Sequence, residues 1–237
     1  MFEFLNFLFP QSTCLACGAG TSPLCLDCRK YMASLTSCRY CACFVLPEDK
    51  FCPNCHGDKP PFSLARAALP YEGELRQRLK ELKYYNKAWL ARPLAALMHQ
   101  AYDIHYRGLV FDGLVAVPLS PQRIKQREYN QAERLASHLA KNLGFPLLKD
   151  ALLRAKETPP LYNVGRQERF ALLLDCFVAV SEKVSGRNLL LIDDIYTTGA
   201  TCFACSQALL AAGAKDVCVL AVASGRSFSL ASEKLIK

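Results

Sequence analysis

Short apolar runs alternate with amphipathic stretches through the second half of the chain. Residues 189–192 form an apolar run that ends in two aspartates, and a helical pattern then continues as far as Leu210. Residues 113–119 form a second apolar run. The helix-spaced apolar positions that follow it are Ala132, Leu135, Ala136, Leu139, Ala140 and Leu143. Apolar runs of this length are typical of buried strands, and the second spacing is typical of an amphipathic helix. The pattern therefore favours an α/β fold with a parallel sheet flanked by helices.

The first 60 residues differ in composition from the rest. They hold nine of the 13 cysteines and are neutral, with five Lys/Arg against five Asp/Glu. Residues 61–237 hold 24 Lys/Arg against 16 Asp/Glu, and therefore the whole formal net charge of +8. Pro60-Pro61 would form a stiff joint between the two parts. We expect a small cysteine-rich module over residues 1–60 and a larger basic domain over residues 61–237.

Eight of the early cysteines form four Cys-x-x-Cys pairs. These are Cys14/Cys17, Cys25/Cys28, Cys38/Cys41 and Cys52/Cys55. Two such pairs complete a tetrahedral four-cysteine zinc site, so eight ligands predict two closed, structural Zn²⁺ sites. If neighbouring pairs share an ion, one site is Cys14, Cys17, Cys25 and Cys28, and the other is Cys38, Cys41, Cys52 and Cys55. Interleaved pairing stays open, because spacing alone does not fix it.

Other uses of these cysteines are weaker alternatives. Cys43 and His56 could each replace a ligand. A disulfide framework is disfavoured because no export signal precedes the module. Redox-active Cys-x-x-Cys pairs are disfavoured because four such pairs are more than redox chemistry requires. A module of this size cannot build a sufficient core alone, so the metal should supply its folding energy.

Asp193 and Asp194 end the run at 189–192, and a Thr/Gly loop at 197–201 follows them. Threonine hydroxyls and backbone N–H groups at a helix N-terminus bind anions. The two carboxylates cannot bind that anion themselves and suit sugar hydroxyls or a nearby metal ion. Ligands of open parallel sheets bind at the carboxyl ends of strands, where this loop is predicted. An ordinary strand–turn–helix connection is the alternative.

A basic segment follows the run at 113–119. Residues 120–131 include Arg123 and Arg127, and we expect a loop that holds a second anion, here pyrophosphate. A solvated basic loop is the alternative. Arg154 and Lys156 precede Pro159-Pro160, on a loop that could close over the site.

Residues 193–201 resemble the phosphoribosyl-pyrophosphate motif of type I phosphoribosyltransferases, and nearly the whole chain resembles the ComF family of competence-associated, phosphoribosyltransferase-like proteins. The resemblance lies in the order of several short motifs. These are the four Cys-x-x-Cys pairs, Pro60-Pro61-Phe62, Tyr71-Glu72-Gly73, Leu82-Lys83-Tyr84, Val117-Pro118-Leu119, Arg123 and Arg127 with Asn130-Gln131-Ala132, and residues 193–201.

The resemblance implies a type I phosphoribosyltransferase-like α/β domain after a double zinc ribbon. Its ligand would be phosphoribosyl pyrophosphate with Mg²⁺. Asp193 and Asp194 would contact the ribose hydroxyls. The residues around the 5′-phosphate would be Thr197, Thr198, Gly199, Ala200 and Thr201. Arg123 and Arg127 complete the candidate catalytic set with the two aspartates.

Two positions depart from the family pattern. Glu128 stands where a glycine is usual, which removes conformational freedom and places a carboxylate beside the expected pyrophosphate. Leu172 stands where an asparagine is expected.

The resemblance also implies a function in natural competence, assisting the uptake of transforming single-stranded DNA beside a helicase-like partner. An active phosphoribosyltransferase on an unknown acceptor, and a zinc module that serves as a scaffold for a partner protein, are the alternatives. The mixed basic and aromatic residues 76–89 would contact single strands, although Leu75, Leu79 and Leu82 also predict a helix with a solvated basic face. No apolar stretch of transmembrane length appears. We expect a cytoplasmic location, with a peripheral place at the inner membrane as the alternative.

Overall fold

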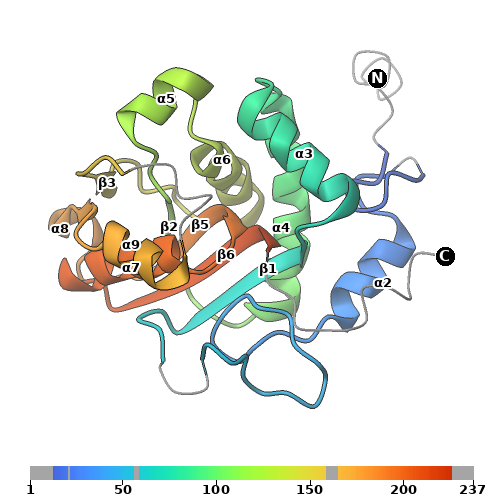
Figure 1. The fold of residues 1–237 in the computed structure, drawn as a ribbon, viewed down its shortest axis with the longest axis horizontal. Coiled ribbons are helices and arrows are strands. Elements are labelled where there is room, and N and C mark those ends of the chain that lie inside the picture. The colour runs from blue at the N-terminus through green and yellow to red at the C-terminus, as the bar shows by residue number, and fades with distance from the viewer. Residues whose placement is uncertain (1–12, 21, 56–58, 159–164, 226–237) are drawn as a thin grey trace.

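A parallel sheet forms the centre of the protein. The structure is a computed structural model that describes residues 13–20, 22–55, 59–158 and 165–225. The strand order is β1-β6-β5-β2, and all neighbours are parallel (Figure 1). The strands are β1 (Leu64–Pro70), β2 (Gly113–Ala116), β5 (Asn188–Tyr196) and β6 (Asp216–Ser224). A parallel bridge between Leu114 and Leu147 extends the sheet beyond β2.

Helices cover both faces of this sheet. One face packs against α3 (Gly73–Tyr84), α4 (Ala91–His105) and α6 (Gln131–Leu143), and the other against α7 (Arg166–Leu173) and α9 (Ala200–Ala211). Alternate strand residues point to opposite faces, so Leu190 and Ile192 belong to the first core and Leu189 and Leu191 to the second. The remaining elements are α2 (Leu26–Ser34), η1 (Ala88–Leu90), α5 (Pro121–Arg127), the antiparallel pair β3 (Leu152–Arg154) and β4 (Phe177–Ala179), and α8 (Ser181–Val184). The predicted α/β architecture is confirmed.

The chain reverses its direction of progress across the sheet between β2 and β5. From β2 it passes through α6 to Leu147, on the outer side of β2. From β5 it passes through α9 to β6, in the other direction and on the opposite face. Such a point leaves a crevice outside the carboxyl ends of the two strands, where open α/β sheets bind ligands.

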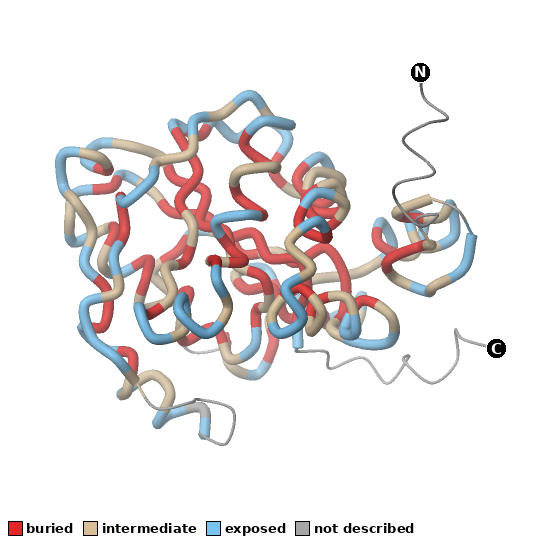
Figure 2. Tube along the Cα trace, turned by 90° about the horizontal axis from the view of Figure 1, so that it is seen from above, coloured by how far each residue is buried: buried red, intermediate tan, exposed pale blue. Residues whose placement is uncertain are grey.

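The two halves of the cysteine-rich region pack into different cores. Cys14, Leu15 and Met32 join the core beneath α3 and α4, whereas Cys38 and Phe44 join the core on the side of α9. Figure 2 shows buried segments both in the main body and in this N-terminal region. The division at residue 60 stays a prediction.

Two local features differ from the sequence-based expectations. The strand predicted over 189–192 continues to Tyr196. The basic segment after β2 is not a loop, because residues 121–127 form the short helix α5. Ser120 caps this helix by accepting a hydrogen bond from the Arg123 backbone N–H, and Pro121 occupies its first turn. A serine cap followed by proline is a standard helix start, so the signal was present in the sequence.

Candidate functional site

A cavity of about 840 Å³ opens at the carboxyl edge of the sheet, between α3, α5 and the start of α9. In Figure 1, α3 and α5 rise on the same side of the sheet. The polar residues that line the cavity are Tyr71, Arg76, Lys83, Tyr84, Arg123, Gln126, Arg127, Asn130, Gln131, Arg154, Arg169, Asp193, Asp194, Thr197, Thr198 and Thr201. The cavity therefore lies where the chain changes direction, and it is strongly basic except for two aspartates.

The acidic pair lies near the carboxyl end of β5. Asp193 Oδ1 accepts a hydrogen bond of 2.8 Å from the Asp194 backbone N–H. Burial raises the pKa of Asp193 to about 7, and the charge of Asp194 adds to this shift. Lys83 opposes it, because its Nζ lies 3.0 Å from Asp194 Oδ2. The pair can accept hydrogen bonds from neutral hydroxyls but repels anions.

The Thr/Gly loop turns sharply between β5 and α9. Gly199 has φ +83°, in the left-handed region. A Cβ at this position would lie 2.2 Å from Tyr196 Oη, so the turn requires glycine for both its backbone and its space. The Thr198 hydroxyl accepts a hydrogen bond from the Ala200 backbone N–H. The first N–H groups of α9 and its dipole face this end of the cavity, which suits a phosphate.

Three arginines line the cavity from other elements: Arg123 and Arg127 lie on α5, which follows β2, and Arg154 ends β3. Burial lowers the pKa of Arg123, and the charges of Arg154 and Arg127 lower it further. Three guanidinium groups therefore lie close enough to repel one another. Such a cluster is stable when it holds a polyanion such as pyrophosphate.

Gln131 adds an unused donor to this cluster. Its side chain is only 1% exposed, and its Oε1 accepts a hydrogen bond of 3.2 Å from Arg127 Nη1. This contact fixes the orientation of the amide, so Nε2 is directed elsewhere. Nε2 has no hydrogen-bond partner among the described residues. A buried donor without a partner is costly, and a ligand oxygen in the cavity would satisfy it.

The structure brings nearly all the predicted ligand residues together. Asp193, Asp194, Arg123 and Arg127 line the one cavity with Thr197, Thr198, Ala200 and Thr201, and Gly199 shapes the loop without being part of the lining. Arg154 also lines the cavity, whereas Lys156 does not. Pro159-Pro160 lies outside the described residues.

The two departures from the family pattern lie away from the cavity lining. Glu128 keeps the left-handed conformation typical of glycine, with φ 65°. Its carboxylate accepts a hydrogen bond from Asn86 Nδ2, and Glu128 is not among the lining residues. The same is true of Leu172. The effect of Glu128 on a bound pyrophosphate stays a prediction.

Sequence reasoning missed the contribution of α3. Lys83 and Tyr84, at the end of this helix, face the cavity together with Arg76 from its first half and with Tyr71. The sequence segment 76–89 suggested a nucleic-acid surface instead. The signals in the sequence were the Tyr71-Glu72-Gly73 and Leu82-Lys83-Tyr84 motifs, whose place in the site depends on packing between distant segments.

The N-terminal cysteines form two candidate metal centres. The groups are Cys14, Cys17, Cys25 and Cys28, and Cys38, Cys41, Cys52 and Cys55. Within each group the sulfur atoms lie within 4.8 Å of one another. Neighbouring pairs therefore share a centre, and the interleaved alternative is wrong.

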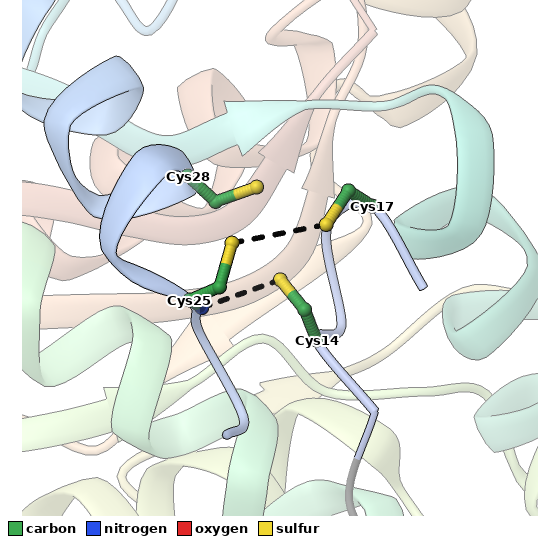
Figure 3. A group of neighbouring side chains, drawn as sticks. All are labelled: Cys14, Cys17, Cys25 and Cys28. Atoms are coloured by element: carbon green, nitrogen blue, oxygen red, sulfur yellow. Dashed lines mark hydrogen bonds between the residues drawn. The ribbon is translucent and has the colours of Figure 1, made fainter. Parts of the chain in front are cut away.

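The geometry of both groups fits tetrahedral zinc. Zn–S bonds of about 2.3 Å place tetrahedral sulfurs about 3.8 Å apart. The Sγ atoms of Cys17 and Cys25 are separated by 3.8 Å (Figure 3), and those of Cys41 and Cys52 by 3.6 Å. Each group could hold a structural zinc ion. Cys43 is not part of the second group, and its Sγ lies 3.5 Å from the Phe44 carbonyl oxygen. His56 lies outside the described residues.

No helix among the described residues combines the length and the apolar character needed to cross a bilayer.

Known proteins with similar sequences carry competence and DNA-utilization names. The chain is 28% identical to Competence protein F of Haemophilus influenzae over 233 residues, which cover 94% of this chain and 99% of that protein. It is 32% identical to Competence protein ComFC of Streptococcus pneumoniae over 64% of each chain. It is 29% identical to DNA utilization protein YhgH of Salmonella typhi over 70% of this chain and 74% of that protein. No family model matches the chain.

Solved structures with partial similarity include two phosphoribosyl-type enzymes. A glutamine phosphoribosylpyrophosphate amidotransferase from B. subtilis, complexed with ADP and GMP, aligns with a TM-score of 0.41 and 18% identity. The alignment covers 60% of this chain and 30% of that one. An adenine phosphoribosyltransferase from Thermoanaerobacter pseudethanolicus aligns with a TM-score of 0.37 and 14% identity, covering 60% of this chain and 83% of that one.

Proposed function

Because this chain belongs to the ComF family, we propose that it acts in natural competence and assists the uptake of transforming single-stranded DNA through a fold that binds phosphoribosyl pyrophosphate. The alignment with Competence protein F spans almost the whole of both chains. The similarity to YhgH extends the support to a protein named for DNA utilization.

The three kinds of residue that line one cavity are the observation that carries the ligand proposal. The lining combines the phosphate-type loop before α9, the acidic pair on β5, and arginines from α5 and β3. A ligand with two anionic ends joined by a sugar matches these three groups. The 5′-phosphate would bind at residues 197–201, the ribose hydroxyls at Asp193 and Asp194, and the pyrophosphate at the arginines.

The charge of the cavity supports the same ligand. Six lining side chains are cationic, namely Arg76, Lys83, Arg123, Arg127, Arg154 and Arg169, against two aspartates. A phosphorylated sugar pyrophosphate carries several negative charges and needs such an excess. Mg²⁺ would arrive with the pyrophosphate and share its charge. The volume of about 840 Å³ is within the range of small-ligand sites.

Phosphoribosyl transfer is the second candidate, favoured by the same geometry. In this reaction an acceptor bonds to the anomeric carbon as the carbon–oxygen bond to pyrophosphate breaks, and the electron pair leaves with the pyrophosphate. Arg123, Arg127 and Arg154 would stabilise the departing charge, and the aspartates would hold the ribose in place.

Contact with single-stranded DNA is proposed for the end of α3 and the segment after it. Tyr84, Tyr85 and Trp89 are exposed, by 66%, 67% and 46%. Lys87 lies between Tyr85 and Trp89 in sequence, and this mixture suits base stacking and phosphate contacts. Leu75, Leu79 and Leu82 are buried, so the predicted apolar face is confirmed and the aromatic surface lies outside it. A helicase-like partner and a peripheral position at the inner membrane belong to this proposal. A zinc module that serves as a scaffold for a partner protein remains its alternative.

Calorimetry with phosphoribosyl pyrophosphate and Mg²⁺ tests the ligand site. The double variant Asp193→Asn, Asp194→Asn should lose at least tenfold in affinity, although it removes negative charge near an anionic ligand. Inorganic pyrophosphate lacks the ribose, so the same variant should bind it at least as well as the wild type. Asp150→Asn is the matched control, because Asp150 is exposed, has φ 54° and does not line the cavity. Absence of wild-type binding at millimolar ligand would refute the proposal.

A further inference from the structure

The last turn of α3 contacts the candidate site at three points. Lys83 Nζ lies 3.0 Å from Asp194 Oδ2. The ring of Tyr84 lies under the guanidinium of Arg127, with 5.0 Å from Cζ to the ring centroid. The backbone carbonyl of Leu82 accepts a hydrogen bond from the buried hydroxyl of Tyr129. These contacts join α3 both to β5 and to the helices that follow β2.

The turn that makes these contacts is firmly held. Leu75, Leu79 and Leu82 pack into the core with at most 1% exposure. Tyr129, between α5 and α6, is 7% exposed and fixes the backbone of the turn. Side chains that project from such a base have defined positions, which is what a ligand site requires of its supporting residues.

Lys83 forms an ion pair with one member of the acidic pair, Asp194. The side chains of Lys83 and Asp194 are 17% and 12% exposed, so the ion pair is largely screened from water. Two adjacent carboxylates repel each other, and an ammonium group at 3.0 Å offsets this repulsion and holds one of them in a fixed rotamer. The Asp193 oxygens accept hydrogen bonds from the Asp194 backbone N–H and from Cys202 Sγ, and Asp194 Oδ2 contacts Lys83. Asp194 Oδ1 is then the oxygen of the pair best placed to accept a hydroxyl donor.

Tyr84 has the corresponding role for Arg127. The guanidinium lies on the tyrosine ring, Nη2 donates to Tyr84 Oη at 3.4 Å, and Nη1 donates to Gln131 Oε1 at 3.2 Å. Arg127 is thus held between a residue of α3 and a residue of α6. A guanidinium that is already oriented loses less side-chain entropy when it binds an anion.

We infer that Lys83 and Tyr84 are positioning residues with divided roles: Lys83 fixes the acidic pair for a ribose, and Tyr84 fixes Arg127 for a pyrophosphate. This inference rests on the proposed function. Under this inference α3 lines one side of the ligand site. Two neighbouring side chains of this helix then act on opposite ends of the ligand.

Two partial ligands test the division. Ribose 5-phosphate probes the acidic pair and the Thr/Gly loop, and Mg²⁺-pyrophosphate probes the arginines. We expect Lys83→Met to weaken ribose 5-phosphate about tenfold and to leave pyrophosphate within twofold of wild type. We expect Tyr84→Leu to weaken pyrophosphate about three- to fivefold, as for the loss of one exposed cation–π contact, and to leave ribose 5-phosphate unchanged.

Conservative variants and structural controls complete the set. Lys83→Arg and Tyr84→Phe keep the charge and the ring, so each should restore most of the affinity. Lys80→Met removes a cation from the same helix that does not line the cavity, and should leave both affinities unchanged. Tyr129→Phe removes the hydrogen bond to Leu82 and should lower the melting temperature without separating the two ligands.

The outcomes distinguish failure of the inference about Lys83 and Tyr84 from failure of the proposed function. Equal loss of both partial ligands in Lys83→Met or Tyr84→Leu would mean a merely structural role and would overturn the inference. Tighter binding of ribose 5-phosphate by Lys83→Met would overturn it too, because Lys83 would then be a competitor for Asp194. A wild type that binds neither partial ligand refutes the proposed function and the inference together. Wild-type binding that depends on Asp193 and Asp194 but not on Lys83 refutes the inference alone.

Discussion

Replacing Gly199 by alanine tests the account of the turn between β5 and α9. An alanine there adopts φ +83° only at a cost of about 1–2 kcal/mol, the penalty for a left-handed residue. Its Cβ would also lie 2.2 Å from Tyr196 Oη and 2.7 Å from Tyr196 Cζ. Tyr196 is 3% exposed and packs edge-on against Phe62, so its movement is restricted. Overpacking of this kind costs about 1–3 kcal/mol more.

The total expected loss of unfolding free energy is about 2–5 kcal/mol, from the sum of the two penalties. For a protein of this size that lowers the melting temperature by roughly 4–20 °C. Denaturant and thermal unfolding of the purified, zinc-loaded protein would measure both quantities. The loop should also lose its phosphate geometry, so binding of ribose 5-phosphate should fall with stability.

Gly144→Ala is the matched control for this experiment. Gly144 has φ +74° at the end of α6, and a Cβ there would meet nothing within 4 Å. It therefore carries the backbone penalty alone. Gly199→Ala should cost about 1–3 kcal/mol more than Gly144→Ala, which is the overpacking contribution. Equal costs for the two variants would refute the claim that Tyr196 excludes a side chain at position 199.

Three further predictions follow from the pKa of Asp193 and from the cysteine groups. The pKa of Asp193 rises from 3.8 to about 7 on folding, so between these pH values the folded state binds more protons than the unfolded chain. The free energy of unfolding should therefore fall as pH rises from about 4 to 7. In denaturant titrations at several pH values, Asp193→Asn should remove this part of the pH dependence. An unchanged slope in the variant would contradict the burial of this carboxyl. Metal analysis should find two zinc ions per chain, reduced to about one in Cys52→Ala and unchanged in Cys43→Ala. Loss of zinc from Cys43→Ala would place the Cys43 thiol among the ligands. Strong chelators should unfold the region around both cysteine groups, seen as loss of exchange protection at the Leu15 and Val45 amides, which donate hydrogen bonds to the Pro23 and Thr36 carbonyls. Retained protection would mean that core packing alone holds the region.

The features predictable from the sequence are those encoded by neighbouring residues. The apolar run at 189–192, the two aspartates and the Thr/Gly loop are contiguous, so their strand–turn–helix arrangement follows from local preferences. The spacing of Leu135 and Leu139 likewise predicts α6, which begins at Gln131. The Cys-x-x-Cys pairs predict zinc knuckles because each pair is its own local unit.

The features that the sequence did not reveal depend on distant contacts. The ion pair of Lys83 with Asp194 joins α3 to β5, and neither segment contains a signal for the other. The same holds for the stacking of Arg127 on Tyr84. Sequence alone therefore indicated the ligand-facing loops and the apolar face of α3, but not the position of α3 at the site. Helix α5 was also missed but does not depend on distant contacts, because Ser120 and Pro121 are a helix-start signal within the sequence itself.

The strand order has a consequence for biosynthesis. Among the strands that the structure describes, the first to be synthesised, β1, lies beside the last, β6, which also pairs with β5. Until β6 leaves the ribosome, β1 has no hydrogen-bonding neighbour on that side. The core around Leu15 and Met32 also lacks Leu220 and Val222. An incomplete chain thus exposes a strand edge and apolar surface, the two features that promote aggregation. We therefore expect the nascent protein to be most prone to aggregation before β6 is synthesised, because β6 contributes residues to the cores on both faces of the sheet.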